Sequence, residues 1–181
     1  QCLVGSEMCI RDRRRNAVWV LILYILIPVF VHGNEAERDA LFHIERNKNA
    51  NIVQYDARLG ADGLLHPEQP VVAYWVRLAE QGQTRELTWI QRKFAYGFAT
   101  KLNKDENTAT LDMAAGLDRT IMVVLDGEDY RALADINGVT SYVDKLFIHA
   151  SGEGLSTRVE YIELHGVSVQ DHSKQYERFI P

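Results

Sequence analysis

Cysteine is almost absent from this sequence of 181 residues, and both of its cysteines, Cys2 and Cys9, stand at the extreme N-terminus. No thiol follows Cys9, which excludes a disulfide, a thiol nucleophile and a cysteine metal ligand from the rest of the chain. An excess of basic residues is also missing. The net charge is -5, so a general role in binding nucleic acid has no electrostatic support. Phosphate-binding loops, dinucleotide fingerprints, zinc-protease helices and nucleophile elbows are absent too, so no motif assigns an activity.

The first 33 residues are expected to lie outside the fold. Residues 1–13 (QCLVGSEMCIRDR) resemble a translated sequencing-adaptor sequence and are interpreted as an artefact. Residues 14–33 are interpreted as a signal peptide, because arginines precede an apolar run, 17–31, that is short for a spanning helix. Cleavage after Gly33 predicts an exported protein, periplasmic or extracellular. Left uncleaved, this segment would be an anchor and the only predicted contact with a membrane.

A single β-rich domain is predicted over 40–170, between a short leader (34–39) and a polar C-terminal tail (171–181). Alternating apolar and polar residues predict its strands. These strands are 41–46, 52–55, 71–78, 98–102, 108–115, 120–125, 130–136, 140–149 and 158–165, with a bulged continuation past Gly166. One short helix is predicted at about 84–96, where Thr84 is a possible cap and Leu87, Ile90 and Phe94 stand at helical spacing. The pattern predicts a mainly β fold, an antiparallel β-barrel or β-sandwich of eight or nine strands.

Two polar clusters are the candidates for a binding site. The turn at 46–51 carries two cations among three asparagines, and the helix carries Arg92 and Tyr96 on one face. Tyr74 and Trp75 are expected on opposite faces of their strand, one in the core and one on an outer or cavity face. The predicted ligand-binding residues are Arg46, Asn47, Lys48, Asn49, Asn51, Tyr55, Tyr74, Trp75, Gln91, Arg92, Lys93 and Tyr96. The alternative is that the asparagines satisfy local backbone groups and that the helix face is merely solvated.

The histidines do not predict a metal site. None of those after residue 33 forms a close pair at ligand spacing. His149 and His165 end neighbouring predicted strands, but a metal ion would need a third ligand, such as Glu163 or Asp144. No cofactor is predicted.

Three short blocks resemble those of a known family. They are 46–55 (RNKNANIVQY), 70–75 (PVVAYW) and 90–97 (IQRKFAYG). Their order and spacing resemble the uncharacterised family domain of unknown function 4833 over most of 40–170. The resemblance implies a secreted or envelope-located bacterial domain and brings no activity with it.

The sequence is compatible with three functions. The first is non-catalytic binding of a small ligand or a cell-envelope partner, which the missing catalytic motifs favour. The second is an envelope hydrolase with dispersed polar catalytic residues, because a catalytic triad is a spatial arrangement that a sequence does not display. The third is a structural interaction module, marked by an exposed apolar patch or an unpaired edge strand.

Overall fold

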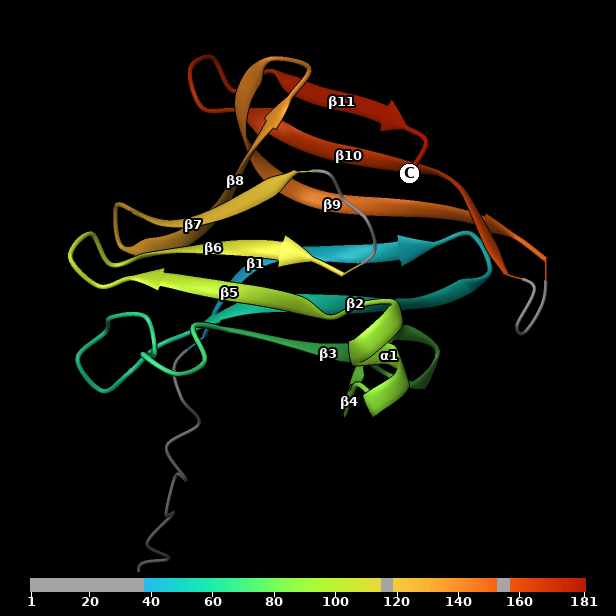
Figure 1. The fold of residues 1–181 in the computed structure, drawn as a ribbon, viewed down its shortest axis with the longest axis horizontal. Helices are drawn as coiled ribbons and strands as arrows, with labels where there is room; N and C mark the ends of the chain where they lie inside the picture. Colours follow the sequence, from blue (N-terminus) through green and yellow to red (C-terminus); the bar gives the residue numbers. More distant parts are fainter. Residues whose placement is uncertain (1–37, 115–118, 153–156) are drawn as a thin grey trace, which may run out of the picture. The chain divides into compact units, whose positions relative to one another are not determined.

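The computed structural model describes residues 38–114, 119–152 and 157–181 (Figure 1). The predicted adaptor artefact (1–13), the signal peptide (14–33) and most of the leader lie outside these residues. No helix in the described ranges is long and apolar enough to span a bilayer.

Strands dominate the described chain, which confirms the predicted mainly β fold with one short α-helix. The strands are β1 (Arg38–Arg46), β2 (Asn49–Arg58), β3 (Val71–Arg77), β4 (Gln83–Glu86), β5 (Phe98–Asn103), β6 (Thr108–Met113), β7 (Thr120–Asp126), β8 (Asp129–Ile136), β9 (Val139–Ser151), β10 (Arg158–Ser168) and β11 (Lys174–Phe179). The α-helix is α1 (Trp89–Phe94), and a 3-10 turn, η1 (Leu78–Glu80), follows β3.

The eleven strands form one curled sheet, a half-barrel. Nine of them follow one another in the order β4-β3-β2-β1-β9-β8-β7-β6-β5, and β10 and β11 branch from β9. The long strand β9 organises it. One edge of β9 pairs antiparallel with β8 and then parallel with β1, while its other edge carries β10 and, beyond it, β11. The curl brings β5 back towards β2, where the rings of Tyr55 and Phe98 lie 5.6 Å apart (Figure 1).

The core follows from alternation along the strands. In β6, Ala109, Leu111 and Met113 are buried, as the sequence predicts, while the residues between them face outward. Strand β7 does the same with Ile121 and Val123. Each large apolar side chain buried in this way contributes about 1.5–3 kcal/mol to stability. The buried residues of all strands from β1 to β10 except β4 and β5 join one continuous cluster, which holds the curl together.

The helix is shorter than predicted and begins later. Residues 83–86 do not begin the helix but form β4, which pairs antiparallel with β3. The cap is Thr88, whose hydroxyl accepts from the backbone N–H of Gln91, while the Gln91 side chain accepts from the Thr88 N–H. This reciprocal pair satisfies two free N–H donors at the start of the helix. It is a stronger signal for a helix start than Thr84, because Glu86 follows Thr84 by two residues and not by the three that a capping box requires. The end is fixed by Gly97, because a Cβ there would lie 1.6 Å from the carbonyl oxygen of Arg92.

The C-terminal strands confirm one prediction and extend another. Strand β10 continues through Gly166 with a register shift between His165 and Gly166, which is the predicted bulge. The segment expected as a tail contains β11, which pairs antiparallel with β10. Its residues 174–179 (KQYERF) are mostly polar, so period-two burial leaves only a weak signal in the sequence.

Gly166→Ala is expected to destabilise the domain on the order of 3 kcal/mol, because overpacking a filled site forces neighbouring groups to move. A Cβ at this position would stand 2.2 Å from the Tyr142 carbonyl oxygen and 2.8 Å from the Ile136 Cδ1 atom. Gly63→Ala is the control, since Gly63 has positive φ with nothing near its Cβ position; it should cost only about 1–2 kcal/mol. Urea unfolding measures the free energy of unfolding of both variants, and equal losses of stability would contradict this packing explanation.

Candidate functional site

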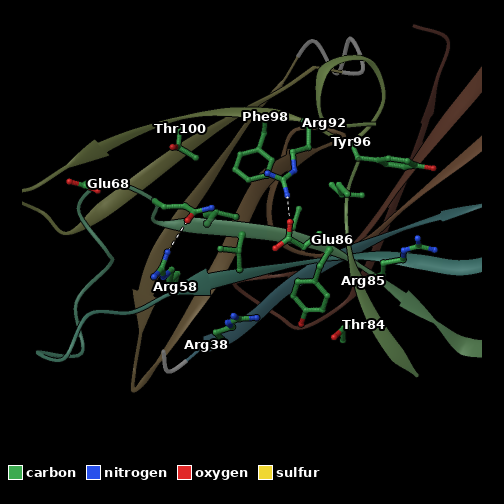
Figure 2. A pocket seen from close by; sticks show the side chains of 17 residues that line it. Arg38, Arg58, Glu68, Thr84, Arg85, Glu86, Arg92, Tyr96, Phe98 and Thr100 are labelled. Carbon is green, nitrogen blue, oxygen red and sulfur yellow. Dashed lines mark hydrogen bonds and ion pairs between the residues drawn. The ribbon is translucent and has the colours of Figure 1, made fainter. Parts of the chain in front are cut away.

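A groove of about 700 Å³ lies where the curled sheet fails to close (Figure 2). We call it the seam groove. Its walls are 71–74 of β3, 84–86 of β4 and the first residues of β5, and Tyr96 and Gly97 lie between them. The lining also includes Arg38, Arg58, Leu87, Arg92 and two residues of the loop before β3, Glu68 and Gln69. The volume falls in the range that small-molecule sites occupy.

The groove exists because two strand edges remain apart. Strand β4 pairs only with 74–77 of β3, so the first part of β3 has no strand on that side within the described residues. Strand β5 pairs with β6 alone in the same ranges. Side chains, not backbone pairing, hold the two edges together. The Tyr55 hydroxyl donates to the Tyr96 carbonyl oxygen at 2.7 Å, and both residues are buried.

Four arginines line the seam groove, each from a different element: Arg38, Arg58, Arg85 and Arg92. Two are engaged by neighbours (dashed lines in Figure 2). Arg92 pairs with Glu86 at 3.0 Å, and Arg58 donates to the neutral amide of Gln69 at 2.8 Å. Among the described residues, two carboxylates, of Glu68 and Glu86, stand in the lining against these four cations. The groove is therefore cationic on a chain whose net charge is -5.

Tyr74 joins this lining to a buried carboxylate. Its hydroxyl donates to Asp56, which is 5% exposed and also accepts from the Gln54 side chain at 3.0 Å. The Arg38 guanidinium lies 5.8 Å from the centre of the Tyr74 ring. Burial, and then the bond to Asp56, raises the pKa of Tyr74 to about 12, so the phenol stays protonated at neutral pH.

A second, smaller hollow of about 270 Å³ adjoins the groove through Arg85 and Glu86, which line both. Four of the predicted binding residues line it: Asn49, Asn51, Trp75 and Gln91. The Trp75 indole N–H donates to the Gln91 side chain at 3.2 Å, so the helix cap and β3 are tied together here. The Oδ1 atom of Asn51 is buried with no hydrogen-bond partner within the described chain.

The structure brings the two predicted clusters into contact at Arg46 and Tyr96. The Arg46 guanidinium lies 5.2 Å from the centre of the Tyr96 ring, which also meets Trp75 edge-on at 5.1 Å. As expected, Tyr74 and Trp75 face opposite sides of β3, with Trp75 packed against the core. Tyr74, Arg92 and Tyr96 are the predicted residues that line the seam groove.

Arg46 lines neither hollow, and the same is true of the four remaining predicted residues. The Asn47 side chain exchanges hydrogen bonds with the Ala150 backbone at 3.1 Å, and Lys48 donates to the Gly152 carbonyl, so both fasten the β1–β2 turn to β9. Tyr55 is a core residue stacked on Phe42 at 4.6 Å. Lys93 stands on the solvent side of α1, over the rings of Trp89 and Phe94.

Sequence reasoning missed three of the four arginines of the seam groove. Arg38 and Arg58 are directly opposed on β1 and β2, yet they stand twenty residues apart in the chain. Arg85 was placed within the predicted helix, although it lies on β4. The only available signal is a basic residue near the end of each strand, which is common on solvated sheet edges.

The two histidines considered for a metal site have separate partners. His149 lies 3.3 Å from Glu160, and His165 lies 3.4 Å from Glu163. In the described part of the chain, no three histidine, cysteine or acidic side chains gather as metal ligands would.

Comparison with known proteins gives a family and nothing more specific. The model of the family Domain of unknown function (DUF4833) matches residues 42–178. No curated protein and no solved structure matches the chain.

Tyr74→Phe is expected to flatten the loss of stability at alkaline pH. The folded protein holds the Tyr74 proton up to a pKa of about 12, whereas the unfolded chain releases it near 10.0. The stability from this difference is fully present below pH 10 and is lost as pH rises towards 12. Thermal melts between about pH 9 and about pH 12 measure it. Parallel curves for the two proteins would contradict this prediction, since all other tyrosines are unchanged.

Proposed function

This chain belongs to the family Domain of unknown function (DUF4833), whose description assigns no activity, and we propose from its geometry that it is a non-catalytic binding domain for an anionic ligand. The ligand site is the seam groove. The ligand is a carboxylate or phosphate compound, free in solution or borne by a component of the cell envelope.

The observation that carries this proposal is the convergence of four arginines on one groove of an acidic protein. Arg38 and Arg58 are directly opposed across two strands, and like charges in that position destabilise a sheet. Arginine also presents a planar set of donors that matches carboxylate and phosphate oxygens. An anion in the groove would relieve this repulsion. It would also accept hydrogen bonds from Arg38 and Arg85, whose donors no carboxylate of the described chain engages.

The polar groups of the groove support binding more than hydrolysis. Glu86 is paired with Arg92, so it is not free to act as a general base. The lining groups with shifted pKa values are Tyr74 and Tyr96, both raised chiefly by burial. A phenol that stays protonated at neutral pH donates hydrogen bonds and does not abstract protons. These contacts favour binding over the predicted alternative, an envelope hydrolase, in which Glu68, the other carboxylate of the described lining, would have to act.

Export to the periplasm or the outside of the cell belongs to the same proposal. Its support is the apolar run at 17–31, which follows several arginines as in a signal peptide. The domain also lacks cysteine, so it needs neither disulfides nor reducing conditions. An envelope location would place the groove among anionic polymers and solutes.

Citrate, pyrophosphate and an oligogalacturonate are suitable probes, because they present the same anionic chemistry on small and polymeric carriers. Binding is measured by isothermal titration calorimetry on the wild type, Arg38→Gln and Arg58→Gln. Each substitution is expected to raise the Kd on the order of tenfold, because a charge-assisted hydrogen bond contributes about 1.5–3 kcal/mol. Preference for the oligogalacturonate would indicate an envelope polymer, and preference for citrate or pyrophosphate a free solute.

Arg131→Gln is the matched control, since Arg131 is an exposed strand arginine that does not line the groove. It should leave the Kd unchanged, although it lowers the net charge by the same amount as Arg58→Gln does. If it weakens binding as much as Arg58→Gln does, attraction is general and the groove is not the site. If none of the three probes binds, the anionic class is wrong.

A further inference from the structure

Helix α1 displays its apolar residues to solvent. Trp89, Ile90 and Phe94 are 68%, 63% and 65% exposed, and no residue of this helix is buried. At about 100° per residue, these three and Lys93 fall within an arc of about 140° on the helix surface. The other two positions, Gln91 and Arg92, point to the body of the domain, where they bond to Trp75 and Glu86. The amphipathic pattern is therefore inverted, with the polar face inward.

The domain holds this helix firmly in place. Leu87 before it and Tyr96 after it are both buried in the core, and the capping pair of Thr88 and Gln91 fixes its first turn. Gly97 allows the chain to pass tightly under the Arg92 carbonyl oxygen. The exposed face is thus a built feature of the fold, because both ends of the helix are anchored while the side chains of its apolar arc stay mostly exposed among the described residues.

A cation sits within the apolar face. The Lys93 ammonium lies 5.1 Å from the centre of the Trp89 ring and 5.2 Å from that of Phe94, and the two rings meet edge-on at 6.4 Å. The helix contains no acidic residue, and the nearby Glu86 is already paired with Arg92. The surface, which we call the α1 patch, consists of two aromatic rings, an isoleucine and a lysine that has no ion pair within the described chain.

We propose that the α1 patch docks the domain onto the surface of an anionic lipid bilayer. Tryptophan, phenylalanine and isoleucine next to lysine suit the boundary between acyl chains and headgroups, where the apolar groups insert and the cation meets anionic lipid. A helix of six residues spans only about 9 Å, whereas a stable protein interface needs about 800 Å² from each partner. A bilayer can accept a few protruding side chains and requires no such area.

This docking does not depend on the seam groove or on residues 17–31. The net charge of -5 does not oppose it, because screening at physiological salt confines repulsion from distant groups to about 8 Å. The predicted third function, an interaction module, gains a specific surface and a specific partner here.

The test follows Trp89 itself, so that binding by the apolar run at 17–31 cannot be mistaken for docking. The chain has three tryptophans, Trp19, Trp75 and Trp89. The full chain with Trp19→Phe is compared with Trp19→Phe/Trp89→Phe, and the difference in emission isolates Trp89. Vesicles contain phosphatidylcholine with or without phosphatidylglycerol, and the phosphatidylcholine carries brominated or plain acyl chains. Bromine quenches only those rings that reach the acyl region.

Brominated vesicles containing phosphatidylglycerol are expected to quench Trp89, and vesicles of phosphatidylcholine alone to quench it much less. Ile90→Ser/Phe94→Ser should weaken this partitioning about tenfold or more, because two large apolar side chains no longer leave water. Met122→Thr/Leu125→Thr removes two exposed apolar side chains of β7 instead and should leave it unchanged. Equal quenching in neutral vesicles, equal loss in the β7 variant or no quenching of Trp89 would each overturn the proposal.

Anion binding in the seam groove is read separately. Ile90→Ser/Phe94→Ser should bind citrate as the wild type does, and Arg38→Gln/Arg58→Gln should retain the quenching of Trp89. Failure of one proposal therefore leaves the other standing.

Discussion

A single buried hydrogen bond joins the two sides of the open seam. The Tyr55 hydroxyl in β2 donates to the carbonyl oxygen of Tyr96, just before β5. The Tyr55 ring also stacks on Phe42 and meets Phe98, and its burial raises the pKa of the phenol, so the donor keeps its proton. This contact brings β5 close to β2 without backbone pairing. The sheet can therefore curl over its core and still leave the unpaired edges that form the seam groove.

The unpaired strand edges determine which side chains line the seam groove. A closed barrel would have used the backbone groups of early β3 and of β5 in a strand ladder, and its arginines would have projected from a continuous surface. The gap instead gathers side chains from β1, β2, β4 and α1 around one cationic hollow. Helix α1 takes part in both proposed sites. It turns Arg92 towards the groove and its apolar arc towards solvent, so one short helix links a ligand site to a docking surface.

Much of the fold could be predicted because its strands bury alternate residues. The alternation in β6, the bulge at Gly166 and the opposite orientations of Tyr74 and Trp75 all follow from a side-chain period of two. The turn between β8 and β9 follows from local sequence as well, because Asn137 and Gly138 both have positive φ, which an Asn-Gly pair tolerates. Family membership could be predicted from three short blocks, which lie at the end of β1 and on β2, on β3, and on α1 up to Gly97.

The candidate site could be predicted only in part, because it depends on contacts between distant segments. Arg46 and Tyr96 stood out in the sequence and do meet, but Arg38, Arg58 and Arg85 gained meaning only once β1, β2 and β4 were arranged in space. The helix shows a second limit. Its apolar spacing reveals one face but not which way that face points, and Ile90 and Phe94 are exposed although an apolar stripe usually faces the core. Asn47 and Lys48 show a third limit, because the polar composition of a turn does not reveal whether its side chains bind a ligand or fasten neighbouring strands, as these two do.

Amide chemical-shift mapping with citrate shows directly whether an anion binds in the open seam. The full chain is titrated, and the backbone amides that move are located on the fold. If an anion binds there, the largest shifts will fall on both walls of the seam, at 71–74 and 84–87 on one side and 96–100 on the other. Shifts confined to β9, β10 and β11, or spread evenly over every surface arginine, would contradict it.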